Sequence, residues 1–134
     1  MTANLTGCFL SKSPHWRTPT NLYTTLDTEF AFDFDPCPLH ADFNGLDVPW
    51  AGKHVFCNPP YGRGVIKWVD KAEEADVAVL LLPARTDTEW FHRCLAHAEE
   101  IRFIRGRLRF GDATNSAPFP SIIVVFRNPE TRKG

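Results

Sequence analysis

Residues 55–62 read Val55-Phe56-Cys57-Asn58-Pro59-Pro60-Tyr61-Gly62, a short apolar run that ends in a proline-rich polar turn. Such a run is typical of a buried strand that delivers side chains to a crevice at the carboxyl edge of an α/β sheet. Pro59 and Pro60 have no N–H and a fixed φ, so they hold the carbonyls of the turn out of any sheet ladder. We therefore expect the Asn58 carboxamide and the carbonyls of residues 58 and 59 to face a ligand.

The chemistry of this turn suits a planar amine. The Asn58 side-chain oxygen and the Pro59 carbonyl can each accept one hydrogen from an exocyclic NH₂ group, while the Tyr61 ring offers a face for stacking. With both hydrogens engaged, the nitrogen lone pair is drawn out of conjugation and can attack an electrophile placed in line. The turn predicts catalysis by positioning, and the alternative is a structural turn with no chemistry.

Four other segments have the composition of strands. The near-continuous apolar run at 76–83 is typical of a central parallel strand covered on both faces. Segment 30–35 alternates apolar and acidic residues toward its end and is expected to be the first strand of the sheet, ending at Pro36. Segments 100–106 and 121–126 predict an antiparallel hairpin at the end of the chain.

Three helices are expected between these strands. The first has Thr18 as its N-cap and Pro19 at its first helical position, and it ends near Glu29. An amphipathic second helix spans about 65–75. The third follows a capping sequence at 86–89. Its side chains expected to face the core are Trp90, Phe91, Cys94 and Leu95.

The motif Asn58-Pro59-Pro60-Tyr61 at a strand end resembles the catalytic motif of the S-adenosylmethionine-dependent amino-methyltransferases, which modify adenine and sometimes cytosine or a protein glutamine. Five further segments agree with the resemblance. They are Trp16-Arg17-Thr18-Pro19 with Leu22, Phe32-Asp33-Phe34-Asp35-Pro36-Cys37, Asn44-Gly45-Leu46 with Trp50, Gly106-Arg107-Leu108-Arg109-Phe110, and Ala117-Pro118-Phe119-Pro120-Ser121. Together they resemble the small phage and prophage DNA adenine methyltransferases of the Dam-like type over roughly residues 14–127.

The resemblance implies roles for particular residues. Asn58 and Pro59 would orient the target amine, Pro60 would stiffen the turn, and Tyr61 would stack on a base flipped out of the duplex. Asp35 would lie near the methionine amino group of the cofactor, S-adenosylmethionine. The full set of implied cofactor contacts is Thr18, Pro19, Asp35, Pro36, Cys37 and Asn44. No glycine-rich turn follows residues 35–37, so the usual second and third strands are expected to be reduced or lost.

The expected fold is an α/β fold with a reduced Rossmann-like methyltransferase sheet, mostly parallel with an antiparallel C-terminal hairpin, and helices on both faces. A chain of 134 residues can bury roughly two-thirds of its unfolded surface around one core. We expect a methyltransferase domain at 14–127, a flexible N-terminal arm at 1–13 and a C-terminal tail at 128–134.

Charge is unevenly distributed although the net charge is only −1. Residues 18–52 contain six acidic residues and no Lys or Arg, which suits a cationic cofactor such as a sulfonium. Arg102, Arg105, Arg107 and Arg109 crowd into one later segment, which suits a phosphate backbone. The candidate contacts to double-stranded DNA are Arg63, Arg107 and Arg109, and the alternative is that these are solvated surface charges.

Targeting signals and cysteines narrow the class of protein. The chain has no apolar run near the ~20 residues of a membrane helix and no apolar core of signal-peptide length at residues 1–14, so we expect it in the cytoplasm of a bacterial host. Its four cysteines are then expected to be reduced. The pairs Cys37-x-x-His40 and His54-x-x-Cys57 leave a zinc site as an alternative, although buried thiols at strand ends account for both cysteines.

The sequence as a whole predicts transfer of a methyl group from S-adenosylmethionine to the 6-amino group of adenine in DNA. One alternative is methylation of the cytosine amine or of RNA. Another is a non-catalytic nucleic-acid-binding domain, either stabilised by zinc or a degenerate methyltransferase. A homodimer also stays open, because a chain this short could need a second copy to embrace a duplex.

Overall fold

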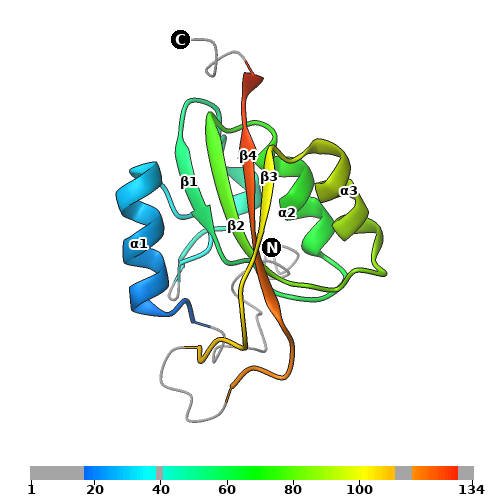
Figure 1. Cartoon of the computed structure of the whole chain (residues 1–134). Helices are drawn as coiled ribbons and strands as arrows, with labels where there is room; N and C mark the ends of the chain where they lie inside the picture. Colours follow the sequence, from blue (N-terminus) through cyan, green and yellow to red (C-terminus); the bar gives the residue numbers. More distant parts are fainter. Residues whose placement is uncertain (1–16, 39–40, 111–115, 130–134) are drawn as a thin grey trace.

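A computed structural model of the chain describes residues 17–38, 41–110 and 116–129. Figure 1 shows a central sheet with α1 against one face and α2 and α3 against the other. The elements are α1 (Thr20–Phe30), η3 (Gly45–Asp47), β1 (His54–Cys57), α2 (Val65–Ala72), β2 (Val77–Pro83), α3 (Glu89–His97), β3 (Glu100–Phe103) and β4 (Ser121–Arg127). The expected N-terminal arm and residues 130–134 of the expected tail lie outside the described residues.

The sheet has the strand order β1-β2-β4-β3. β1 and β2 are parallel, with Cys57 opposite Leu80. β4 lies between β2 and β3 and is antiparallel to both, with Ser121 opposite Pro83. The mixed α/β class and the helices on both faces are confirmed, but the expected mostly parallel sheet is wrong. The reason is that the chain reverses after β3 and inserts β4 beside β2, which turns two of the three strand pairs antiparallel.

The segment expected as the first strand, residues 30–35, forms one isolated bridge and no full strand. Phe34 bridges Val55 in the parallel direction. The Asp33 N–H donates to the His54 carbonyl over 2.9 Å, and the Phe56 N–H donates to the Phe34 carbonyl over 3.1 Å. The segment therefore lies beside β1 in the expected direction without making a regular ladder.

Local hydrogen bonds explain why this ladder is so short. α1 continues to Phe30, and Ala31 follows in the left-handed region with φ 54°. The Asp33 carboxylate accepts the His54 N–H over 2.9 Å, so a side chain makes a bond that a strand would make with its backbone. At the other end, the Asp35 carboxylate accepts the Cys37 N–H over 2.9 Å and turns the chain away.

β2 is the centre of the core, as its apolar run predicts. All seven of its residues are buried, and their side chains alternate between the two faces of the sheet. Ala78, Leu80 and Leu82 pack with the face covered by α2 and α3. Val79 and Leu81 pack with the face covered by α1. Full burial of a leucine is worth about 1.5–3 kcal/mol, so this strand contributes strongly to stability.

The helix predictions hold in outline and fail at some ends. The N-cap of α1 is Pro19, in an extended conformation, so the prediction of Thr18 as the cap is wrong. α2 ends at Ala72, before the expected 75. α3 is capped as expected, because the Thr88 hydroxyl accepts the Phe91 N–H over 3.2 Å. Leu95 was expected in the core but is 55% exposed, because it lies outside the stripe of buried side chains on this helix, which are Trp90, Phe91 and Cys94.

Candidate active site

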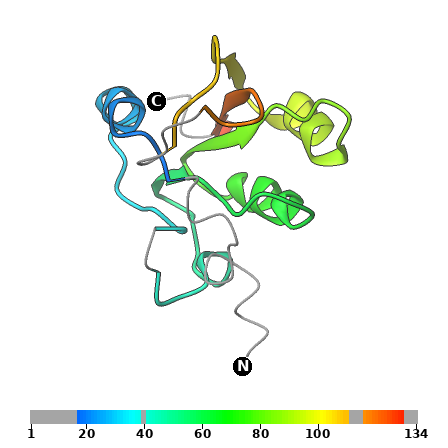
Figure 2. The same cartoon turned by 90° about the horizontal axis from the view of Figure 1, so that it is seen from below.

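The corner formed by residues 58–61 lies at the carboxyl end of β1, and Figure 2 looks onto this edge of the sheet. α1 begins at the same edge, and residues 104–110 and 116–120 lie there too (Figure 1). Pro59 is buried, whereas Asn58, Pro60 and Tyr61 are partly exposed. The corner is therefore partly exposed at three of its four residues, while the Asn58 Oδ1 atom itself is buried.

Asn58 is held by a residue forty positions earlier in the chain. Its Nδ2 atom donates a hydrogen bond to Thr18 Oγ1 over 3.0 Å. The sequence predicted Thr18 as a helix cap and as a cofactor contact, and no sequence pattern paired it with Asn58. Because a carboxamide rotates freely when unsupported, this bond restricts how the Asn58 side chain is presented.

Tyr61 is held at both ends of its side chain. Its hydroxyl donates to the Leu81 carbonyl over 3.3 Å. Its ring meets Phe119 edge to face, with centroids 5.7 Å apart. Burial is the main cause that raises the pKa of the Tyr61 hydroxyl far above its ordinary value, so this group stays protonated. The neutral Tyr61 hydroxyl therefore acts as a hydrogen-bond donor that helps to fix the ring at the corner.

A cation that sequence reasoning missed lies beside this aromatic pair. The Arg85 guanidinium stands over the Phe119 ring, 5.4 Å from its centroid. Arg85 is exposed and comes two residues after the end of β2, at the edge that carries Asn58. Its signal in the sequence was available, because Arg85 follows the β2 apolar run much as Asn58 follows β1.

Asp35 ends the segment that runs beside β1. Its burial raises the pKa of its carboxyl from 3.8 to about 6, against the opposing effect of the bond from the Cys37 N–H. Asp35 follows the residue that bridges Val55, so it lies beside β1. Burial and, after it, the charge of Asp35 raise the pKa of the Cys57 thiol at the end of that strand. A partly buried acid therefore stands next to the strand that carries Asn58.

The turn that follows the predicted cofactor residue Asn44 packs on another such residue, Pro36. A Cβ atom at Gly45 would lie 2.0 Å from the Pro36 carbonyl oxygen, so the turn of η3 packs directly on residue 36. The Asn44 Oδ1 atom accepts the Leu46 N–H over 3.0 Å. Trp50 anchors the same turn, because its Nε1 donates to the Gly45 carbonyl over 3.0 Å. Asn44 thus caps η3 beside Pro36.

Cys37 is disulfide-bonded, so the expectation that all cysteines are reduced is wrong at this position, whereas Cys57 and Cys94 are free. A disulfide also removes Cys37 from the alternative zinc site, and His40 lies outside the described residues. Within residues 17–38, 41–110 and 116–129, no group of three or more His, Cys, Asp or Glu side chains is arranged to hold a metal ion.

The candidate nucleic-acid contacts are exposed but do not share a strand. Arg63 lies on the lip after the corner, where Gly62 adopts φ 132°. β3 ends at Phe103, short of the expected 106, so Arg107 and Arg109 lie beyond the strand. Arg107 instead donates to the Ala117 carbonyl over 3.4 Å, which ties the two arms of the loop together. Residues 111–115 of that loop lie outside the described residues.

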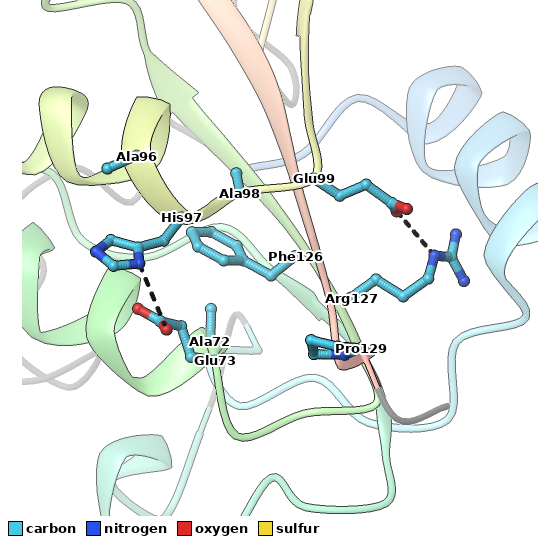
Figure 3. A pocket seen from close by; sticks show the side chains of 9 residues that line it. All are labelled: Ala72, Glu73, Ala96, His97, Ala98, Glu99, Phe126, Arg127 and Pro129. Atoms are coloured by element: carbon cyan, nitrogen blue, oxygen red, sulfur yellow. Dashed lines mark hydrogen bonds and ion pairs between the residues drawn. The ribbon is translucent and has the colours of Figure 1, made fainter. Parts of the chain in front are cut away.

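A cavity of about 500 Å³ lies at the opposite edge of the sheet from the corner, near the end of β4 (Figure 3). The His97 ring lies 3.9 Å from the Glu73 carboxylate beside it, and Arg127 forms an ion pair with Glu99 at 2.8 Å. It contains none of the predicted site residues. Its lining consists of Ala72, Glu73, Ala96, His97, Ala98, Glu99, Phe126, Arg127 and Pro129.

Comparison with known proteins shows which proteins this chain resembles. The family described as DNA N-6-adenine-methyltransferase (Dam) matches residues 10–133. A DNA N-6-adenine-methyltransferase of Haemophilus phage HP1 is 28% identical over 83% of this chain and 77% of its own length. A protein of the same description from Escherichia phage T1 is 30% identical over 69% of this chain and 45% of its own length. No solved structure matches the chain.

None of the described helices is long and apolar enough to cross a membrane.

Proposed function

This chain belongs to the DNA N-6-adenine-methyltransferase (Dam) family and is an adenine-specific DNA methyltransferase, and we propose that residues 58–61 form its catalytic corner and that S-adenosylmethionine is its methyl donor. The observation that carries the proposal is the position of Asn58: a carboxamide held by Thr18, at a strand end, beside the partly buried acid Asp35. The proposed catalytic domain spans 14–127.

The proposed chemistry is a direct displacement at a methyl carbon. The Asn58 Oδ1 atom and the Pro59 carbonyl accept the two hydrogens of the adenine amine and leave its lone pair directed at the methyl group. A nitrogen–carbon bond forms as the sulfur–carbon bond breaks, and the electron pair of that bond stays on sulfur. The methylated amine then gives up a proton to water. Tyr61 and Phe119 provide the aromatic wall for the flipped base.

A cationic donor suits the carboxyl of Asp35. S-adenosylmethionine supplies an electrophilic methyl group on a sulfonium, together with a methionine amino group. Burial disfavours the ionised form of the Asp35 carboxyl, and a positive charge nearby would favour that form. We place the methionine end of the cofactor at Asp35, and Pro36 and the turn of η3 beside it. Pro19, Cys37 and Asn44 are the remaining proposed contacts.

Double-stranded DNA is proposed to approach the same edge from outside. Arg63, Arg107 and Arg109 are exposed there, and Arg85 joins them because it stands over the ring that contacts Tyr61. Guanidinium groups around an entry for one flipped base would bind the flanking phosphates. Since its substrate is DNA, we place the enzyme in the cytoplasm of a bacterial host.

The experiment that tests the proposal is methylation of unmodified duplex DNA with radiolabelled S-adenosylmethionine, followed by nucleoside analysis. We expect N6-methyladenine from the wild-type protein and a loss of at least about 100-fold in kcat for Asn58→Ala, with cofactor binding intact. Asn21→Ala, at an exposed position on α1, is the matched control and should keep full activity. Labelled 4-methylcytosine in place of N6-methyladenine would refute the assignment.

A further inference from the structure

We infer that Thr18 is a positioning residue for the proposed catalytic carboxamide, because its hydroxyl accepts from Asn58 Nδ2 and so holds the amide in the orientation that leaves Oδ1 for the substrate. The inference rests on the proposed role of Asn58. It assigns to Thr18 a task distinct from holding the cofactor. The observation behind it is the 3.0 Å hydrogen bond from Asn58 Nδ2 to Thr18 Oγ1, which joins the start of α1 to the end of β1.

The position of Thr18 in the fold supports this assignment. A threonine at the start of a helix ordinarily accepts a hydrogen bond from the first turn. Here the N-cap is Pro19, with φ −60° and ψ 135°, and no side chain caps α1. The Thr18 hydroxyl is directed at Asn58 instead of at its own helix. The local sequence thus places a capping residue type where it serves a distant side chain.

The chemistry of a carboxamide shows what the bond achieves. The two ends of the Asn58 amide are nearly the same size, yet one end donates and the other accepts. With Nδ2 bound to Thr18, the buried Oδ1 atom is the end of the amide left to accept from the adenine amine once the base enters the corner. In the reverse orientation the NH₂ group would meet the substrate NH₂ group, and two donors would oppose each other. The Thr18 contact, as observed, therefore holds the amide in the productive orientation.

The platform that carries Thr18 is rigid. Leu26 and Phe30 of α1 are buried against the sheet, in the same cluster as Phe56 of β1. Tyr23 also meets Phe56 edge to face, with ring centroids 5.1 Å apart. Because α1 and β1 share this packing, the core fixes the start of the helix that follows Thr18 relative to the end of β1.

Three substitutions test the inference. Thr18→Val removes the hydroxyl and keeps the shape, Thr18→Ser keeps the hydroxyl, and Thr20→Val changes an exposed threonine two residues later. We expect Thr18→Val to lower kcat by about 10- to 100-fold while KM and Kd for S-adenosylmethionine change by less than about 3-fold. Thr18→Ser and Thr20→Val should keep kcat within about 3-fold of wild type. Thr18→Ala provides a second variant without the hydroxyl should Thr18→Val fold poorly.

A measurement without turnover separates this inference from the proposed function. The side-chain ¹⁵N–H₂ resonances of Asn58, identified by their loss in Asn58→Ala, should shift in Thr18→Val and stay in place in Thr20→Val. Unchanged Asn58 resonances in Thr18→Val would overturn the inference even if the enzyme proved active. It would equally be overturned by a Thr18→Val enzyme with wild-type kcat at saturating cofactor, including one whose cofactor affinity alone falls about tenfold.

Discussion

Asp35 is the residue whose surroundings change its chemistry most clearly. Removal of its carboxyl from water raises its pKa from 3.8 to about 6, and the bond from the Cys37 N–H only partly offsets that effect. The folded protein therefore holds this proton more tightly than the unfolded chain does. As far as Asp35 is concerned, the ligand-free protein is most stable below pH 3.8 and loses that stability as the pH rises to about 6.

We predict that Asp35→Asn raises the free energy of unfolding of the ligand-free protein at pH 8, by up to about 3 kcal/mol, because it removes a carboxylate that is costly to ionise. The gain should shrink at pH 4, where the wild-type group is protonated. Urea denaturation at both pH values measures the difference. Asp42→Asn, at an exposed position, is the control and should change neither value. An equal gain at both pH values would contradict the assigned pKa.

The same substitution should weaken binding of S-adenosylmethionine. The cationic cofactor favours the ionised carboxylate, so wild-type affinity is expected to fall as the pH drops below about 6. Titration calorimetry between pH 5 and 8 should show this fall in the wild type. Asp35→Asn should bind weakly at every pH, with a nearly flat profile. A parallel fall in both proteins would place the titrating group elsewhere.

Two substitutions at Tyr61 distinguish the role of its ring from that of its hydroxyl. Tyr61→Phe should cost about 1 kcal/mol of stability, through loss of the bond to the Leu81 carbonyl, and keep kcat within a few-fold of wild type. Tyr61→Ala should lower kcat/KM for DNA much further, because it removes the stacking surface. Steady-state kinetics with both variants checks this order. Activity losses of the same size would mean that the hydroxyl and not the ring carries the function.

Between elements, the contact of η3 with Pro36 decides whether the proposed cofactor turn keeps its shape. Gly45 lies so close to the Pro36 backbone that even a methyl group has no room. We predict that Gly45→Ala lowers the free energy of unfolding by at least about 2 kcal/mol and weakens cofactor binding. Gly64→Ala is the matched control, since nothing lies within 4 Å of its added Cβ. Thermal denaturation and calorimetry of the two variants test the contrast.

Another connection between elements involves one of the clustered arginines. Arg102 of β3 makes two hydrogen bonds, of 2.7 and 2.6 Å, to Glu29 of α1, and it also bonds Glu100. Its guanidinium stands over the Phe30 ring, 5.3 Å from the centroid. Arg102 therefore ties the edge strand to α1. The tie is structural, so the basic cluster at 102–109 is not uniformly directed at DNA.

At the scale of the whole molecule, the place of an arginine in the fold decides its role more than its place in the sequence does. Arg85 and Arg107 lie toward the edge that carries the corner, whereas Arg93 pairs with Asp70 and Glu89 on the surface of the helices. We predict that Arg85→Ala and Arg107→Ala each weaken DNA binding and lower the dependence of log K on log salt by about 0.9. Arg93→Ala should change neither quantity. Fluorescence anisotropy at several salt concentrations measures the slopes, and unchanged slopes in Arg85→Ala would remove it from the interface.

Much of the architecture followed from local patterns. The apolar run of β2, a cap for α3 within residues 86–89 and the hairpin of β3 with β4 were all predicted from composition and turn signals. The direction of strand pairing was not predictable in the same way. β4 inserts between β2 and β3, and that choice depends on which faces can be buried together.

By itself, the sequence determined the turn at 58–61 that we propose as catalytic, the strand that precedes it and the family to which they belong, because proline stiffness and apolar periodicity act over a few residues. Only the tertiary structure decided that Thr18 holds Asn58, that Arg85 joins the corner and that segment 30–35 makes one bridge. The physical reason is that such contacts join residues distant in the chain, and packing of α1 and the sheet settles them. No local preference of Thr18 or Arg85 carries that information.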